Sequence, residues 1–177
     1  MPKTDEVRRE WFVVHTRSRF ENVVFEGLQK KAFEVFLPKV RVKSRRRDRK
    51  LMIRMPIFPG YLFVKTRSNP YEQVEVVKTL GVVRFIGTKH GGPVPVAEET
   101  IASLRIMVGA DNPIVTGNRL VKGDRVMVTR GPFSGVIGTF VRYRGKGRVM
   151  INVDALGQTA GFDIDQEDIE PLPQILA

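Results

Sequence analysis

The chain has 177 residues, 42% of them hydrophobic, and this composition is typical of a folded protein of one or two domains. The absence of cysteine excludes disulfides and thiolate metal sites, and it fits a reducing cytoplasm. No apolar run approaches the roughly 18 residues of a membrane span, and the charged N-terminus lacks a signal-peptide core, so we expect a cytoplasmic protein without a membrane partner.

The net charge of +11 is distributed unevenly. Residues 1–110 contain 22 Lys and Arg against 11 Asp and Glu, whereas residues 111–177 contain eight of each. All the excess positive charge therefore lies in the first part. This asymmetry predicts two domains, of which only the first faces a polyanion. A basic surface kept for solubility is the alternative.

The first predicted elements are a buried strand at Trp11–His15 and a helix that begins after Ser18. Ser18 and Glu21 have the spacing of a capping box, in which each side chain bonds a free backbone N–H of the first helical turn. Apolar residues recur every fourth position from there to about Lys31. The sequence therefore predicts a helix with one buried face.

An extended segment is expected next, over 34–42, where apolar residues alternate and Pro38 interrupts the pattern. Residues 43–50 have no apolar side chain. They are predicted to form the solvated tip of a hairpin, whose second strand leads back from residue 51.

The most distinctive stretch is Ile57–Val64, with the sequence IFPGYLFV. Pro59 has no backbone N–H and Gly60 tolerates a positive φ, so a turn or bulge is predicted there, followed by a strand. Such a turn presents Phe58 and Tyr61 either to a partner or to the core. The residues alone leave both alternatives open.

Asn69 followed by Pro70 predicts the start of a short helix that ends near Lys78. Its apolar residues Val74 and Val77 are expected to point inward.

A further strand and helix are predicted at 82–86 and 98–108, with a turn at 91–93 between them. The order β-α-β-β-α-β-α indicates an α+β domain with an antiparallel sheet. The segment 109–118 is rich in turn residues and lacks periodicity, which predicts a linker.

Beyond residue 120 the pattern is purely β, and Gly138 marks an expected kink. Several short strands within fewer than 60 residues predict a small closed barrel, which leaves no exposed sheet edges.

Three motifs, in this order, resemble the NusG family of transcription elongation and antitermination factors: WFVVHTRSRFENVV, IFPGYLFV with the later GVVRFIG, and VKGDRVMVTRGPFSGVIGTFV. The resemblance covers roughly residues 10–172. It implies an N-terminal NGN domain with an antiparallel sheet and flanking helices at 8–109, a linker at 110–119, and an all-β SH3-like KOW barrel at 120–173. The basic stretch after residue 33 is similar to specialised paralogues.

The resemblance implies a non-enzymatic bacterial factor that binds RNA polymerase and modulates pausing, termination or antitermination. In the family, the NGN domain docks on the clamp helices of the large polymerase subunit. The docking residues implied here are Trp11, Ile57, Phe58, Pro59 and Tyr61.

Contacts with upstream or non-template DNA are also implied, and Lys and Arg side chains attract phosphates without reading sequence. The candidates are Arg17, Arg19, Lys39, Arg41 and Lys43. Arg17 and Arg19 come first, because the start of a helix holds them better than a loop does.

The KOW domain of housekeeping members contacts the termination factor Rho or a small-subunit ribosomal protein through a Phe before a Gly. Leu156 stands at that place here, so Phe133 and Leu156 are the candidates for partner binding.

No catalytic constellation is predicted. The acidic residues near position 165 lack the spacing of a calcium loop, and no phosphate-binding loop or nucleophile with a base is found in the sequence. We therefore expect no enzyme activity, no cofactor, no metal and a monomer. A ribosome-associated KOW-type RNA-binding protein is the alternative, but it would require a basic C-terminal part.

Overall fold

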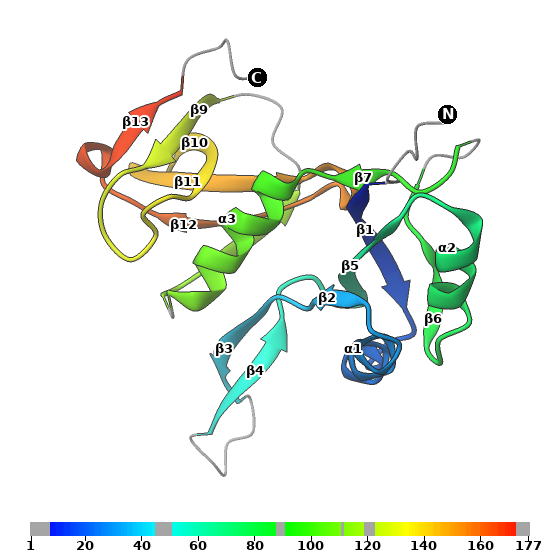
Figure 1. Cartoon of the computed structure of the whole chain (residues 1–177). Helices are drawn as coiled ribbons and strands as arrows, with labels where there is room; N and C mark the ends of the chain where they lie inside the picture. The colour runs from blue at the N-terminus through cyan, green and yellow to red at the C-terminus, as the bar shows by residue number, and fades with distance from the viewer. Residues whose placement is uncertain (1–7, 45–50, 88–90, 111, 119–122, 173–177) are drawn as a thin grey trace, which may run out of the picture. The chain divides into compact units, whose positions relative to one another are not determined.

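The computed structural model describes residues 8–44, 51–87, 91–110, 112–118 and 123–172. The chain divides into two compact units (Figure 1). The first comprises the described residues of 1–37 and 58–97, and the second those of 38–57 and 98–177. The hairpin segment 38–57 therefore interrupts the first unit in sequence.

The first unit is an antiparallel sheet with two helices. Its elements are β1 (Arg9–Thr16), α1 (Glu21–Lys30), β2 (Glu34–Phe36), β5 (Tyr61–Arg67), α2 (Pro70–Val77), β6 (Val82–Phe85) and β7 (Pro95–Val96). The strand order is β2-β5-β1-β6, and β7 also pairs with β1. These pairings confirm the predicted antiparallel sheet. The predicted extended segment is also interrupted as expected, between β2 and β3 (Lys39–Lys43).

One face of this sheet forms the core with α1 and α2. In the β1–β5 register Phe12 lies opposite Val64 and Val14 opposite Leu62, and successive side chains of a strand alternate between faces. These residues therefore share a face, which the two helices pack against (Figure 1). The buried cluster there contains Val14, Val24, Leu28, Leu37, Leu62, Val64 and Val76.

The two predicted helix starts have different outcomes. The Asn69 side chain accepts a hydrogen bond from the Glu72 N–H at 2.9 Å, which confirms Asn69 as the N-cap of α2. The capping box at Ser18 is wrong, because Phe20 occupies the N-cap of α1 and makes no side-chain cap. Glu21 is instead directed to a distant turn, described below.

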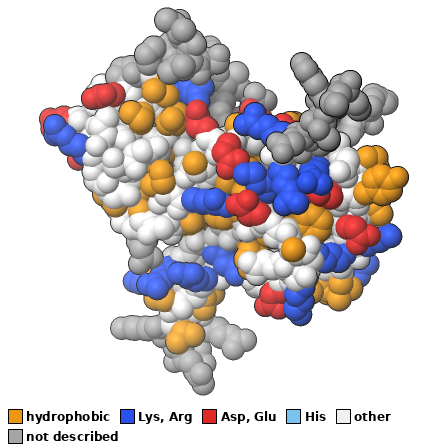
Figure 2. All heavy atoms as spheres, in the orientation of Figure 1, with side chains coloured by type: hydrophobic (Ala, Val, Ile, Leu, Met, Phe, Trp, Pro, Cys, Tyr) orange, Lys and Arg blue, Asp and Glu red, His pale blue; other side chains and the backbone are white. Residues whose placement is uncertain are grey.

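The expected orientation of α2 is also wrong. Val76 is its buried residue, whereas Val74 and Val77 are more than two-fifths exposed. Together with Phe85 and Pro93 they line an apolar groove of about 430 Å³ in the first unit. Figure 2 shows hydrophobic side chains at the surface in the region of α2.

The second unit contains a two-stranded hairpin, a helix and a six-stranded antiparallel sheet. Its elements are β3, β4 (Met52–Pro56), α3 (Glu98–Gly109), β8 (Val115–Asn118), β9 (Asp124–Val128), β10 (Ile137–Tyr143), β11 (Lys146–Val153), β12 (Gln158–Asp163) and β13 (Ile169–Pro171), with short 3-10 helices at Asp154–Leu156 and Gln166–Asp168. The α3 helix contacts this sheet: the Ser103 hydroxyl accepts the Ile137 N–H at 3.1 Å, and Arg125 pairs with Glu99.

The expected closed barrel is not found among the described residues. The larger sheet follows the open path β13-β9-β10-β11-β12-β8, so β13 and β8 are its two edges. The edge strand β8 lies within the segment predicted as a linker, where it pairs with β12. Pairing with a strand 40 residues away thus overrides a local sequence that lacks any strand pattern.

Candidate functional site

The turn between β4 and β5 is held by its backbone. The Tyr61 N–H donates to the Phe58 carbonyl at 3.1 Å, with Pro59 and Gly60 at the two central positions. Gly60 has φ +83°, as position i+2 of a type II turn requires. Its carbonyl accepts the Thr16 N–H of β1 at 2.8 Å. The predicted turn is therefore present, and β1 fixes one side of it.

Glu21 fixes the other side of this turn. Glu21 is only 8% exposed, and its Oε1 accepts a hydrogen bond from the Gly60 N–H at 2.8 Å. Sequence reasoning missed this role, because the partner is 39 residues away and no local pattern points to it. The sequence pointed instead to a local role, because Glu21 has the spacing of a capping box with Ser18.

The sheet face opposite the helices is aromatic. Trp11, His15, Phe36, Tyr61 and Phe63 lie on this aromatic face, as the strand registers require. His15 stacks on Tyr61 with ring centroids 5.0 Å apart, and Phe36 stacks on Phe63. The Lys65 ammonium lies 5.6 Å from the centre of the Trp11 ring, within the range of a cation–π contact.

The structure separates the expected docking residues into two groups. Trp11, Ile57 and Phe58 are 1%, 6% and 0% exposed, so for Phe58 the structure agrees with the core alternative. Phe58 packs edge-on against Phe63, with centroids 6.2 Å apart. Pro59 is exposed, and Tyr61 is partly exposed. The rings of Phe58 and Tyr61 therefore differ in role, one supporting the turn and the other reaching its surface.

Arg17 and Arg19 are exposed at the bend between β1 and α1. The Arg17 N–H donates to the Gly81 carbonyl at 2.8 Å, and the Phe20 N–H donates to the Arg17 carbonyl at 3.0 Å. Arg19 has φ +65°, a left-handed conformation that costs a residue with a side chain roughly 1–2 kcal/mol. The bend thus holds two guanidinium groups outward at some cost in strain.

The β3–β4 hairpin has one basic and one apolar face. Lys39, Arg41 and Lys43 alternate along β3, and Arg54 lies directly opposite Arg41. Like charges opposite each other on neighbouring strands are destabilising. Figure 2 shows Lys and Arg side chains over this hairpin. The predicted tip residues 45–50 lie outside the described residues.

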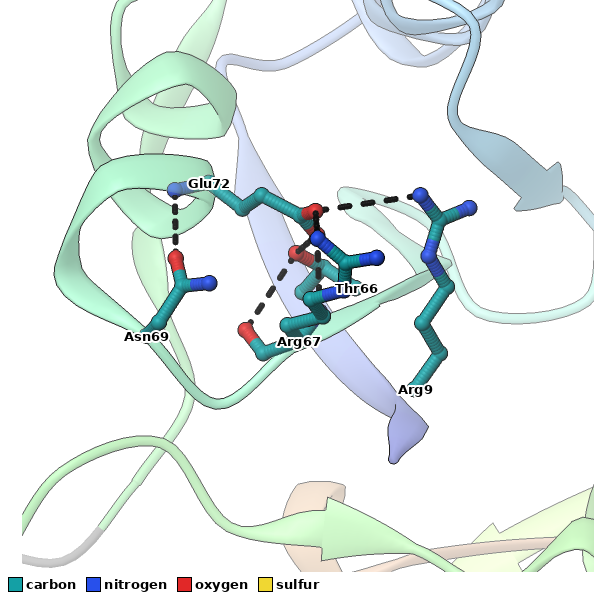
Figure 3. A network of polar contacts seen from close by, with 5 residues as sticks. All are labelled: Arg9, Thr66, Arg67, Asn69 and Glu72. Carbon is teal, nitrogen blue, oxygen red and sulfur yellow. Dashed lines mark hydrogen bonds and ion pairs between the residues drawn. The ribbon is translucent and has the colours of Figure 1, made fainter. Parts of the chain in front are cut away.

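A polar network ties α2 to the end of β5 (Figure 3). The Glu72 carboxylate accepts hydrogen bonds from the Thr66 hydroxyl at 2.7 Å and the Arg67 N–H at 2.8 Å, and it pairs with Arg9 at 3.7 Å. Burial alone would raise the pKa of Glu72. The bonds from Arg67 and Thr66 and the charges of Arg9 and Arg67 outweigh it, so this pKa is lowered.

This lowered pKa predicts an acid-sensitive contribution to stability. The contribution is present above the ordinary glutamate pKa and is lost as the pH falls through the lowered pKa of the folded state. We expect Glu72→Gln to lower the free energy of unfolding by about 1 kcal/mol at neutral pH and by less near pH 3. Urea unfolding at both pH values measures the difference.

Glu75→Gln on the same helix is the matched control. The Glu75 carboxylate is half exposed and pairs with Lys31 and Lys78, so its loss should cost little at either pH. A loss from Glu72→Gln that is equal at both pH values would contradict the assignment.

The two expected partner-binding residues of the C-terminal sheet, Phe133 and Leu156, also differ in exposure. Phe133 is buried and stacks on Phe162 with centroids 3.8 Å apart, so it is a core residue in this conformation. Leu156 is partly exposed at the end of the 3-10 turn between β11 and β12, next to Gly157 with φ +61°. Only Leu156 of the two is placed to touch another molecule.

Two further features bear on the function class. None of the helices that the structure describes is long and apolar enough to cross a membrane. Within the same described residues, no group of three or more His, Asp or Glu side chains is arranged to hold a metal ion.

The comparisons with known proteins agree on one family. The family model described as "NusG: Transcription termination factor nusG" matches residues 9–105, more than half of the chain. The transcription termination/antitermination protein NusG of Thermus thermophilus is 31% identical, over 88% of this chain and 95% of that protein. The NusG protein of Deinococcus radiodurans matches with the same identity and coverage.

The fold is also similar to that of a solved structure, Thermotoga maritima NusG, described as showing a domain interaction. The TM-score is 0.51 at 24% identity, over 94% of this chain and 98% of the other. The order of the three sequence motifs, the antiparallel sheet and these matches have one explanation: the chain belongs to the NusG family of transcription termination and antitermination factors.

Proposed function

We propose that this chain binds RNA polymerase through the Tyr61 end of its aromatic face, and thereby modulates elongation without catalysis. The observation that carries the proposal is the rigid presentation of Tyr61. Its ring is stacked on His15, and hydrogen bonds from two other elements fix the turn before it. Aromatic anchors that are ordered before binding commonly dominate interface energy.

The clamp helices of the large subunit are the proposed ligand. A pair of helices offers a groove between them, and an aromatic edge on a rigid turn fits such a groove. Pro59 and Tyr61 are proposed to make the contact. Trp11, Ile57 and Phe58 support it from within the fold, because they are buried in this conformation.

Tyr61→Ala tests the proposal. We expect the dissociation constant for core polymerase to rise about 30-fold, which corresponds to the roughly 2 kcal/mol of a typical anchor residue. Tyr71→Ala is the matched control, because Tyr71 is a tyrosine of the same unit and is 85% exposed on α2. Surface-immobilised polymerase with each purified variant gives the constants. An unchanged affinity of Tyr61→Ala would contradict the docking assignment.

We also propose that Arg17, Arg19 and the basic face of the β3–β4 hairpin contact the phosphates of upstream or non-template DNA. Two-stranded ribbons of this kind fit the major groove of a duplex. The register supports the proposal, because it places Arg41 directly opposite Arg54 and so gathers positive charge on one face of the hairpin, where phosphates are attracted. Arg54 thus joins the set that the sequence predicted.

Arg19→Gly separates charge from strain. We expect it to stabilise the fold by up to about 1 kcal/mol, because glycine adopts a positive φ freely, and to reduce the salt slope of DNA binding by roughly 1. Ala32→Gly is the matched control, since Ala32 has φ +63° and carries no charge. It should raise stability without changing the salt slope. Binding isotherms on duplex DNA at several salt concentrations decide between the outcomes.

For the C-terminal part we propose a separate recruiting role. In this proposal, residues 8–109 form the polymerase-binding domain and residues 120–173 the recruiting domain, and residues 110–119, which include the edge strand β8, connect the two. The partner is Rho or a small-subunit ribosomal protein, contacted by Leu156. The partial exposure of Leu156 on a tight turn supports this assignment. Linking two binding modules raises the effective concentration of the second partner near the transcript.

A further inference from the structure

We propose that Glu21 is a positioning residue for polymerase binding: it selects the type II form of the Phe58–Tyr61 turn and so sets the direction of the Tyr61 ring. The inference rests on the proposed docking of Tyr61. It starts from one contact, the 2.8 Å hydrogen bond that the Gly60 N–H donates to the buried Glu21 carboxylate.

The geometry of the turn shows what this bond controls. A type I turn and a type II turn differ mainly by a flip of the central peptide, here the one joining Pro59 and Gly60, which reverses the sign of φ at Gly60. Both forms tolerate proline at the first central position, so Pro59 does not choose between them. The Gly60 N–H belongs to that central peptide. Its bond to Glu21 is therefore the contact that a flip would break.

The two peptides that flank Gly60 are held by different elements. Glu21, the first residue of α1, holds the one before it. Thr16, the last residue of β1, holds the one after it through the Gly60 carbonyl. Tyr61 follows directly, and its ring stacks on His15 of β1. A flipped central peptide would change the path into Tyr61 and disturb that stack.

The position of Glu21 suits a carboxylate. Residues at the start of a helix lie at the positive end of its dipole, which favours a negative side chain. A hydrogen bond to a charged acceptor is also stronger than one between neutral groups. A buried polar group costs free energy unless it is hydrogen-bonded, and the bond from the Gly60 N–H meets this need for the Glu21 side chain.

The experiment compares Glu21→Gln with Glu21→Leu. Glutamine retains an oxygen that can accept the Gly60 N–H, whereas leucine fills similar space without an acceptor. We expect Glu21→Leu to raise the dissociation constant for core polymerase about tenfold, and Glu21→Gln to restore most of the affinity. The backbone amide resonance of Gly60 reports the bond directly. In the wild-type chain and in Glu21→Gln this resonance should be shifted downfield and the amide protected from exchange. In Glu21→Leu neither the shift nor the protection is expected.

A double-mutant cycle with Tyr61→Ala distinguishes the two possible failures. If Glu21 acts through Tyr61, adding Glu21→Leu to Tyr61→Ala should not weaken binding further. If Tyr61→Ala binds as the wild type does, the proposed docking itself fails. If Tyr61→Ala weakens binding and a folded Glu21→Leu does not, only the positioning role is overturned. If Glu21→Leu does not fold, the Gly60 amide decides. An unprotected Gly60 amide in the wild-type chain overturns the positioning role. A protected Gly60 amide supports the role if Glu21→Gln retains both the protection and the affinity for polymerase.

Discussion

Replacing Phe58 by alanine is expected to lower the free energy of unfolding by about 3–5 kcal/mol, the range for large buried aromatic residues. The Phe58 side chain is completely buried and meets the Phe63 ring edge-on. Its removal leaves a cavity beside Phe63 and loses the contact of the two rings. Urea unfolding measures the change, with the fluorescence of Trp11, the single tryptophan, as a probe on the same face.

Tyr61→Ala is the matched comparison, because Tyr61 follows in the same turn and is only partly buried. Its unfolding free energy should fall much less than that of Phe58→Ala. The two variants distinguish a residue that supports the fold from one that contacts polymerase. If Phe58→Ala loses polymerase capture, we expect instability to be the cause, whereas a loss by Tyr61→Ala is expected without instability. A cost below about 1 kcal/mol for Phe58→Ala would show that its burial contributes little to the fold.

The second large effect is expected at Gly161 in β12. A Cβ atom at this position would collide with the Val149 carbonyl oxygen and the Met150 sulfur of the neighbouring strand β11. The sulfur ends a flexible side chain, but the carbonyl belongs to the backbone and cannot move without disturbing the sheet. We expect Gly161→Ala to destabilise the C-terminal sheet by about 3 kcal/mol, the upper part of the range for overpacking.

Gly109→Ala is the control for this substitution. Gly109 ends α3, and a Cβ atom there meets nothing within 4 Å. Alanine also favours helix over glycine, so this variant should be neutral or slightly more stable. Amide hydrogen exchange in β11 and β12, compared with that in β1 and β5, locates the effect. If the amides of β11 and β12 in Gly161→Ala are protected from exchange as well as those of β1 and β5, the prediction is refuted.

Local chemistry was enough to predict where most elements begin and end. The N-cap at Asn69 depends on residues within one helical turn, and the break at Pro38 depends on one ring. The motif around Gly60 likewise predicted a turn, because only a residue without a side chain adopts its positive φ easily. The distribution of charge likewise predicted a basic first part, and the order of the motifs pointed to the family, because both are properties of the residues themselves.

The structure alone decided which side chains are covered and which distant groups meet. Phe58 and Tyr61 are both aromatic residues of one turn, yet one is buried and the other reaches the surface. Glu21 has the spacing of a cap but bonds a turn 39 residues away, and β8 forms only because β12 offers it a partner edge. Burial and pairing depend on contacts between segments far apart in the chain, and these contacts leave no periodic trace in either segment.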